Sequence, residues 1–168
     1  KIEFPEDYYQ GEYIKDIAGA ARRERGDSAG DLGELPYFQK AAEDSIFADI
    51  RKTLARMGLA FDVYYNEKSL YDTGKIETVI RDLRERGLVY DSEGAVWFRA
   101  SAAGLEQDRV IVKSTGEPTY RLPDMAYHKD KLDRGFDLIV DIFGADHIAA
   151  YPDVLAGLKA LGYDPEKV

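Results

Sequence analysis

The run Phe-Asp-Leu-Ile-Val-Asp-Ile-Phe at residues 136–143 decides the fold, because branched and aromatic side chains in a short run predict a central strand. The turn Gly-Ala-Asp-His at residues 144–147 ends this strand. A helix is predicted over residues 151–161, with Val154, Leu155, Leu158 and Leu161 on its inner face. Strand, short polar turn and helix form half of a βαβ unit, so this end of the chain is predicted to be a nucleotide-binding type of α/β structure.

The turn at residues 144–147 is the first place to expect a ligand, since ligands of open parallel sheets bind at the carboxyl ends of strands. Gly144 allows a ligand to approach the backbone closely. Asp146 is able to accept hydrogen bonds from ribose hydroxyls, and His147 to hydrogen-bond a nucleotide or carry a proton. The alternative is that Asp146 only caps the following helix.

The chain before residue 115 is predicted to be a mixed module of helices and hairpins. Apolar spacing, glycines and turn residues predict helices at 13–25, 37–57, 67–71 and 75–86, a strand at 61–65 and a hairpin at 88–99. A second hairpin is predicted from residues 109–113 and 119–122, followed by a helix at 124–132. We place a boundary near residue 115, and the fold class is α/β.

Residues 119–137 are dense in Tyr, Asp, His, Lys and Arg. If Tyr120 ends a strand and Asp124 begins a helix, both face one pocket. There Asp124 would accept hydrogen bonds from a guanidinium and Tyr120 would offer a ring face to a cation, which is how a protein selects a cationic amino acid. The alternative is a solvated amphipathic helix with charge pairs along its surface.

Composition narrows the class of protein. The 168 residues carry a net charge of −9, are 45% hydrophobic and contain no cysteine, which excludes disulfides and thiolate zinc sites. No stretch is long and apolar enough for a membrane span, so we expect a cytoplasmic protein without a membrane partner. The missing initiator Met predicts that the true start lies upstream. With this charge, any contact with nucleic acid is expected to be local.

Five stretches in register resemble the arginyl-tRNA synthetases of class I. They are residues 9–14 (Tyr-Gln-Gly-Glu-Tyr-Ile), 61–63 (Phe-Asp-Val) with 67–71 (Glu-Lys-Ser-Leu-Tyr), 108–110 (Asp-Arg-Val), 119–137 and 144–147. The resemblance implies a fragment of a ligase that activates L-arginine with ATP, accompanied by Mg2+, and transfers it to tRNA(Arg). It also implies that residues 1–115 form an insertion module and that residues 116–168 are the second half of a Rossmann-like nucleotide-binding fold.

The same resemblance implies roles for individual residues. Tyr120 and Asp124 match the family's arginine-binding pair, and Gly144, Asp146 and His147 match its ATP-side turn. Tyr127 and His128 match the motif as further pocket residues without a defined role. The chain departs from the commonest motif at residues 148–150, where Ile-Ala-Ala follows His147.

We predict that the 168-residue fragment shows no measurable arginine-dependent pyrophosphate exchange and is monomeric. The family's upstream His-x-Gly-His-like element, which grips the ATP phosphates, is absent from these residues. Catalysis in this class depends on positioning both reactants, which half a pocket cannot do. Clear exchange activity of the fragment would contradict this expectation.

Two other functions compete with this interpretation. The predicted helix at 75–86 and hairpin at 88–99 resemble the recognition helix and wing of a nucleic-acid-binding winged-helix module. Glu77, Asp82 and Glu85 on that helix make it a poor surface for phosphates. A stand-alone arginine or nucleotide sensor is the third possibility.

Overall fold

The computed structural model describes residues 11–26, 35–145 and 150–168, which pack as two compact units, Lys1–Tyr64 and Tyr65–Val168. The boundary predicted near residue 115 lies inside the second unit, where β3 (Arg109–Val112) contacts α5 (Arg121–Asp133). That boundary stays a prediction about how the complete catalytic region is assembled.

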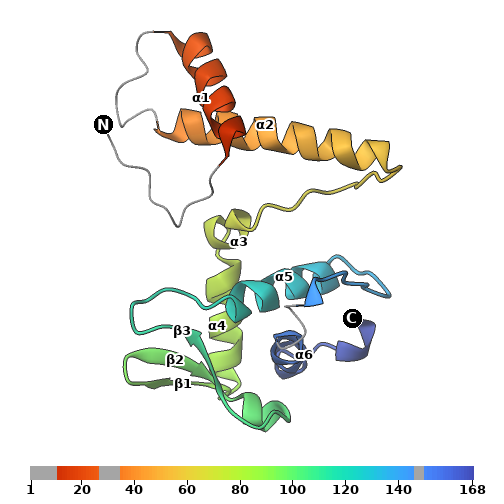
Figure 1. The fold of residues 1–168 in the computed structure, drawn as a ribbon. Helices are drawn as coiled ribbons and strands as arrows, with labels where there is room; N and C mark the ends of the chain where they lie inside the picture. Colours follow the sequence, from red (N-terminus) through yellow and green to blue (C-terminus); the bar gives the residue numbers. More distant parts are fainter. Residues whose placement is uncertain (1–10, 27–34, 146–149) are drawn as a thin grey trace. The chain divides into compact units, whose positions relative to one another are not determined.

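The first unit contains two helices, α1 (Glu12–Arg25) and α2 (Leu35–Arg56), which pack against each other (Figure 1). Ala21 is the buried residue of α1, and its carbonyl accepts a hydrogen bond from the Tyr37 hydroxyl at 3.4 Å. The predicted strand at 61–65 is wrong, because those residues run without a strand partner. An extended run needs a neighbour with matching hydrogen bonds to become a strand.

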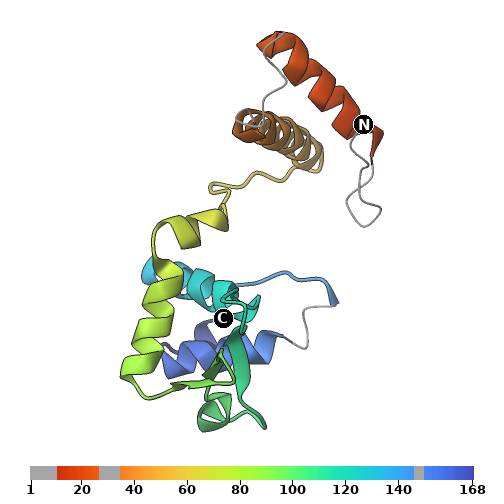
Figure 2. The ribbon, with the colours of Figure 1, turned by 90° about the vertical axis from the view of Figure 1, so that its left-hand side faces the viewer.

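The second unit is built on an antiparallel sheet and the helices packed on it. The sheet has the order β1–β2–β3, with β1 (Val89–Ser92) and β2 (Ala95–Phe98) forming the predicted hairpin. The helices are α3 (Lys68–Asp72), α4 (Lys75–Glu85), α5 and α6 (Tyr151–Ala160), with short 3-10 turns at Ala100–Ala103 and Pro165–Lys167. Figure 1 shows α5 and α6 side by side, and Figure 2 shows α4 next to α5.

One core holds these elements together. Its fully buried large side chains come from α3, α4, the sheet, α5 and α6: Leu70, Val79, Leu83, Phe98, Ile111, Leu122, Met125 and Leu158. Gly157 lets α5 and α6 approach, since a β-carbon there would lie 2.5 Å from the Met125 sulfur. The core therefore fixes α5, which carries the candidate site residues.

Helix α5 begins at Arg121, three residues before the predicted start. Pro123 is tolerated there because the first-turn N–H groups of a helix have no intrahelical partner. The second predicted hairpin is therefore only partly correct: β3 pairs with β2, but a single bridge between Val112 and Pro118 precedes the helix.

The predicted strand at 136–143 is also wrong in this structure. The segment is extended, but the one backbone hydrogen bond seen for it joins the Ile139 N–H to the Lys167 carbonyl at 2.7 Å. Val140 and Ile142 are 74% and 93% exposed. The structure is thus mixed α/β with a small antiparallel sheet of β1–β3, and the segment that decided the predicted fold has no strand neighbour within the described residues.

Candidate functional site

A small pocket of about 190 Å3 lies at the start of α5. Asp124 and Tyr127 stand one helical turn apart and therefore share a face of the helix. Opposite them lie Tyr65 and Glu67, which precede α3. Leu70 and Pro123 complete the lining. The pocket thus combines two carboxylates with two tyrosines.

The two tyrosines form an aromatic wall that is braced by cations. The rings of Tyr65 and Tyr127 lie 4.5 Å apart between centroids and are inclined by 32°. Lys75 hydrogen-bonds the Tyr65 hydroxyl at 3.2 Å and pairs with Asp130 on α5. The hydrogen bonds to Asp130 and Tyr65 raise the pKa of the Lys75 ammonium against the opposing effect of burial, so this brace stays charged.

Such a pocket is suited to a cationic group. Carboxylate oxygens accept charge-assisted hydrogen bonds from a guanidinium, and aromatic faces attract cations. Asp124 is half-buried in the first turn of α5. The backbone N–H groups of that turn interact favourably with a negative charge, so the first turn of α5 is a suitable place for the Asp124 carboxylate.

Tyr120 lies outside this lining. It caps the start of α5, is 56% exposed, and its ring carries the Arg121 guanidinium at 4.7 Å. Sequence reasoning missed Tyr65 and Glu67 as site residues. Glu67 belongs to a stretch that carried the family resemblance, and Tyr65 lies between two such stretches.

Asp153 anchors the beginning of α6 to β3 and α5. It is buried, and it accepts from the Arg109 guanidinium at 3.0 and 3.1 Å and from Arg121 at 2.6 Å. A buried carboxylate needs such paired cations. These ion pairs hold the first turn of α6 against β3 and α5.

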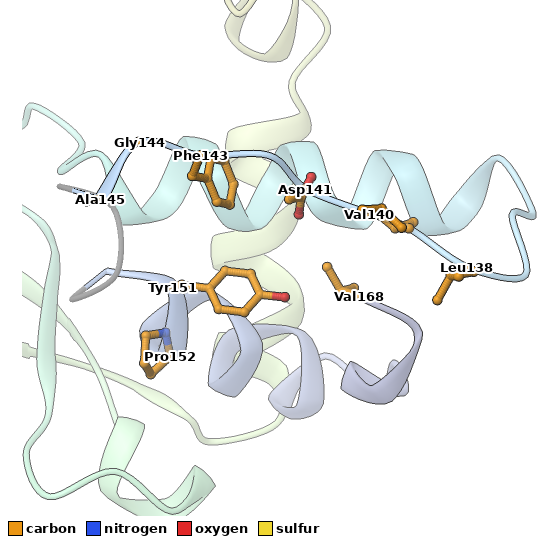
Figure 3. Close-up of a pocket in the computed structure, with 10 residues that line it drawn as sticks. Leu138, Val140, Asp141, Phe143, Gly144, Ala145, Tyr151, Pro152 and Val168 are labelled. Atoms are coloured by element: carbon orange, nitrogen blue, oxygen red, sulfur yellow. The ribbon is translucent and has the colours of Figure 1, made fainter.

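A larger groove of about 790 Å3 lies between the extended segment 138–145 and α6. Figure 3 shows the Tyr151 ring of α6 beneath this segment, with Asp141, Phe143 and Gly144 above it. Gly144 therefore lines a groove. Asp146 and His147, the other two predicted ATP-side residues, lie outside the described residues.

His128, on the same helix as Asp124, is buried in a polar cluster. Its Nε2 lies 2.6 Å from the Asp141 carboxylate, which also accepts from the Lys131 ammonium at 2.5 Å. Burial raises the pKa of Asp141, but the hydrogen bonds from Lys131 and His128 outweigh it and hold the pKa below its usual range.

We expect Asp141→Asn to make the chain less sensitive to acid. A carboxyl whose pKa is lowered by folding stabilises the fold above its unfolded pKa, and this contribution is lost as the pH falls through the folded pKa. Near neutral pH the free energy of unfolding of the wild type should exceed that of the variant by about 1–3 kcal/mol, which is the scale of hydrogen bonds to a charged group. This difference should shrink as the pH falls toward about 3. Urea unfolding across this range measures it, and a gap that grows in acid would contradict the assignment.

Two kinds of feature are absent from the residues that the structure describes. Across residues 11–26, 35–145 and 150–168, no cluster of three or more metal-binding side chains occurs. In that part of the chain, no helix is both long and apolar enough to cross a membrane.

The comparisons with known proteins agree in their result. The family model described as the catalytic domain of class I tRNA synthetases (R) matches residues 26–168. The arginine--tRNA ligase of Desulfotalea psychrophila is 56% identical over 168 residues, which is 100% of this chain and 30% of that protein. The arginine--tRNA ligase of Salinibacter ruber is 51% identical over 98% of this chain and 29% of its own length.

Comparison with a solved structure shows that the fold is shared as well. The putative arginyl-tRNA synthetase of Campylobacter jejuni superposes with a TM-score of 0.88 at 35% identity, covering 99% of this chain and 37% of that one. The chain spans about 30% of the length of the curated relatives it matches. The helix and hairpin of the winged-helix alternative, α4 and β1–β2, lie within the matched region. The chain belongs to the class I arginyl-tRNA synthetase family and covers part of the catalytic domain.

Proposed function

We propose that this chain supplies the arginine-reading side of the catalytic site in an enzyme that activates L-arginine with ATP and transfers it to tRNA(Arg). The observation that carries the proposal is the pocket in which Asp124 and Glu67 face the Tyr65–Tyr127 pair. Two carboxylates and two ring faces select a cation with several N–H donors, and a guanidinium has five of them.

In this proposal Asp124 accepts hydrogen bonds from the substrate guanidinium, and the Tyr127 ring limits the position of the guanidinium from the side. Tyr120, at the N-terminal end of α5, shields the bound arginine side chain from solvent. Holding the side chain at this end orients the arginine carboxylate for in-line attack on the α-phosphate of ATP. Mg2+ would arrive bound to ATP and would supply neutralisation of charge on the phosphates.

We further propose that residues 136–143 are a strand of a Rossmann-like sheet whose neighbours lie elsewhere in the complete enzyme. The branched composition of the segment and the exposure of Val140 and Ile142 support this. The turn containing Gly144, Asp146 and His147 would then lie at the carboxyl end of that strand and face ATP. Residues 1–115 would be mainly the insertion that separates the two halves of the fold and helps to hold the tRNA acceptor end.

Amide hydrogen exchange is expected to reveal the missing neighbours of this strand. In the 168-residue chain, amides of residues 138–143 should exchange fast, because few of them donate to a backbone partner. In the complete enzyme the same amides should be protected. Equal, fast exchange in both proteins would contradict the sheet.

The proposed function is tested by aminoacylation with the complete protein, ATP, Mg2+ and total tRNA. Labelled arginine should enter tRNA, and lysine and the neutral isostere citrulline should not. Citrulline is the sharper comparison, because it has the shape of arginine without the charge that two carboxylates require. Transfer of citrulline at the arginine rate would contradict the proposed pocket, and arginine binding without transfer would favour the sensor alternative.

A further inference from the structure

His128 is a buried side chain with both ring nitrogens in hydrogen bonds. It is 3% exposed on α5, and its Nδ1 lies 2.8 Å from the backbone carbonyl oxygen of Asp124. A carbonyl oxygen only accepts, so Nδ1 carries a proton and donates it. In a neutral imidazole the other nitrogen, Nε2, would then be an acceptor.

That second nitrogen faces another acceptor. Nε2 lies 2.6 Å from the Asp141 carboxylate, whose pKa is held below its usual range, so Asp141 is ionised at neutral pH. The ring of His128 therefore joins the Asp124 carbonyl to the Asp141 carboxylate through its two nitrogens.

The groups around this ring come from three elements. Lys131, on the same helix, holds the second oxygen of Asp141. Tyr127 contributes an edge-on ring at 6.3 Å. From α6, Tyr151 lies near Asp141, and burial together with that negative charge raises the pKa of its hydroxyl. The only carboxylate bound to the ring among the described residues is thus that of Asp141.

The two partners of His128 line two different pockets. Asp124 lines the small pocket at the start of α5. Asp141 lines the groove formed by the extended segment that continues into Gly144 (Figure 3). The buried ring of His128 therefore links the backbone of one pocket to a side chain of the other.

We propose that His128 is a positioning residue that couples the arginine-side pocket to the groove lined by residues 138–145 and α6, so that occupying one adjusts the other. The inference rests on the proposed function and deepens it. Coupling between two sites is reciprocal and is measured as the change in one ligand's affinity when the other is bound. A buried histidine that only stabilised the fold would leave that ratio unchanged.

The experiment uses the complete enzyme and measures the arginine Kd by calorimetry with and without a saturating non-hydrolysable ATP analogue. The wild-type ratio of the two Kd values is expected to be at least about fivefold. In His128→Gln and His128→Asn a single amide nitrogen replaces two ring nitrogens that point in different directions, so neither variant spans both partners as the ring does. The ratio of the two arginine Kd values should therefore fall to about one in both variants, because neither variant restores the whole link.

Asp141→Ala removes the link from the other side and should give the same loss, which keeps the test open if the His128 variants do not fold. The matched control is Asp133→Ala. Asp133 is a carboxylate on the far end of α5 that accepts from Lys129 at 2.7 Å and from the Tyr163 hydroxyl at 2.6 Å. This control should keep the wild-type ratio.

Each result decides between the proposals. Loss of coupling in the His128 and Asp141 variants but not in Asp133→Ala supports the inference. A wild-type enzyme that binds arginine without coupling, or His128 variants that keep the ratio, would overturn the inference and leave the proposed function standing. A wild-type enzyme that binds no arginine at all would overturn the proposed function itself.

Discussion

Replacing Asp124 with Asn in the complete enzyme is expected to weaken arginine binding by about 2–3 kcal/mol, roughly 30- to 150-fold. The substitution keeps the size of the side chain and removes the charge that pairs with the guanidinium. The remaining carboxylate, Glu67, is in the same pocket and explains why the loss is not larger. Because Asp124 is proposed to bind the guanidinium of arginine, the loss of affinity should appear in the KM and Kd for arginine more than in those for ATP.

The control for this prediction is Asp133→Asn on the same helix. Asp133 lies outside the pocket and is bound to Lys129 and Tyr163, so its loss should leave arginine affinity unchanged. Binding is measured by calorimetry with arginine. An Asp124→Asn enzyme with wild-type arginine affinity would remove Asp124 from the site.

Truncating Phe98 to Ala is expected to destabilise the second unit by about 3–5 kcal/mol. Phe98 lies on β2, the middle strand of the sheet, and is fully buried in the core. The cavity would remain because the strand is held on both edges, by Val89 on β1 and Arg109 on β3. A loss of this size is a large share of the stability of a small unit.

Urea unfolding of the 168-residue chain measures this effect, with Trp97, the single tryptophan, as a fluorescent reporter beside the altered position. The matched variant is Phe136→Ala, since Phe136 is 53% exposed and should cost less than about 1 kcal/mol. Equal losses in the two variants would contradict the assignment of the core.

Helix α4 and the first hairpin were predictable because their information is local. Ile76, Val79 and Leu83 repeat at helical spacing and are all buried, and Gly87 follows the end of the helix. The turn at residues 93–94 separates two short β-prone runs, and the hairpin forms there as expected. In these elements, neighbours in the sequence are sufficient to specify the structure.

The strand predicted at 136–143 depended on partners that the sequence around it does not contain. Its composition is that of a buried strand, yet Ile142 is 93% exposed in the structure. Strand pairing is a long-range property, so composition predicts the tendency and cannot supply the neighbour. The same reason explains why the predicted strand at 61–65 is absent.

The candidate site was predictable in part. Asp124 and Tyr127 share a helical face, and the structure brings both into one pocket. Tyr65 and Glu67 reach that pocket from a distant part of the chain, and the pairing of His128 with Asp141 joins a helix to an extended segment. Contacts of this kind depend on how α3, α4 and α5 pack, which no local spacing reveals.

The most direct test of the account is a crystal structure of the complete enzyme with bound arginine. The guanidinium is expected to lie within hydrogen-bond distance of the Asp124 carboxylate, in the pocket bounded by Tyr65, Glu67 and Tyr127. A guanidinium bound elsewhere, with Asp124 facing no ligand, would contradict it.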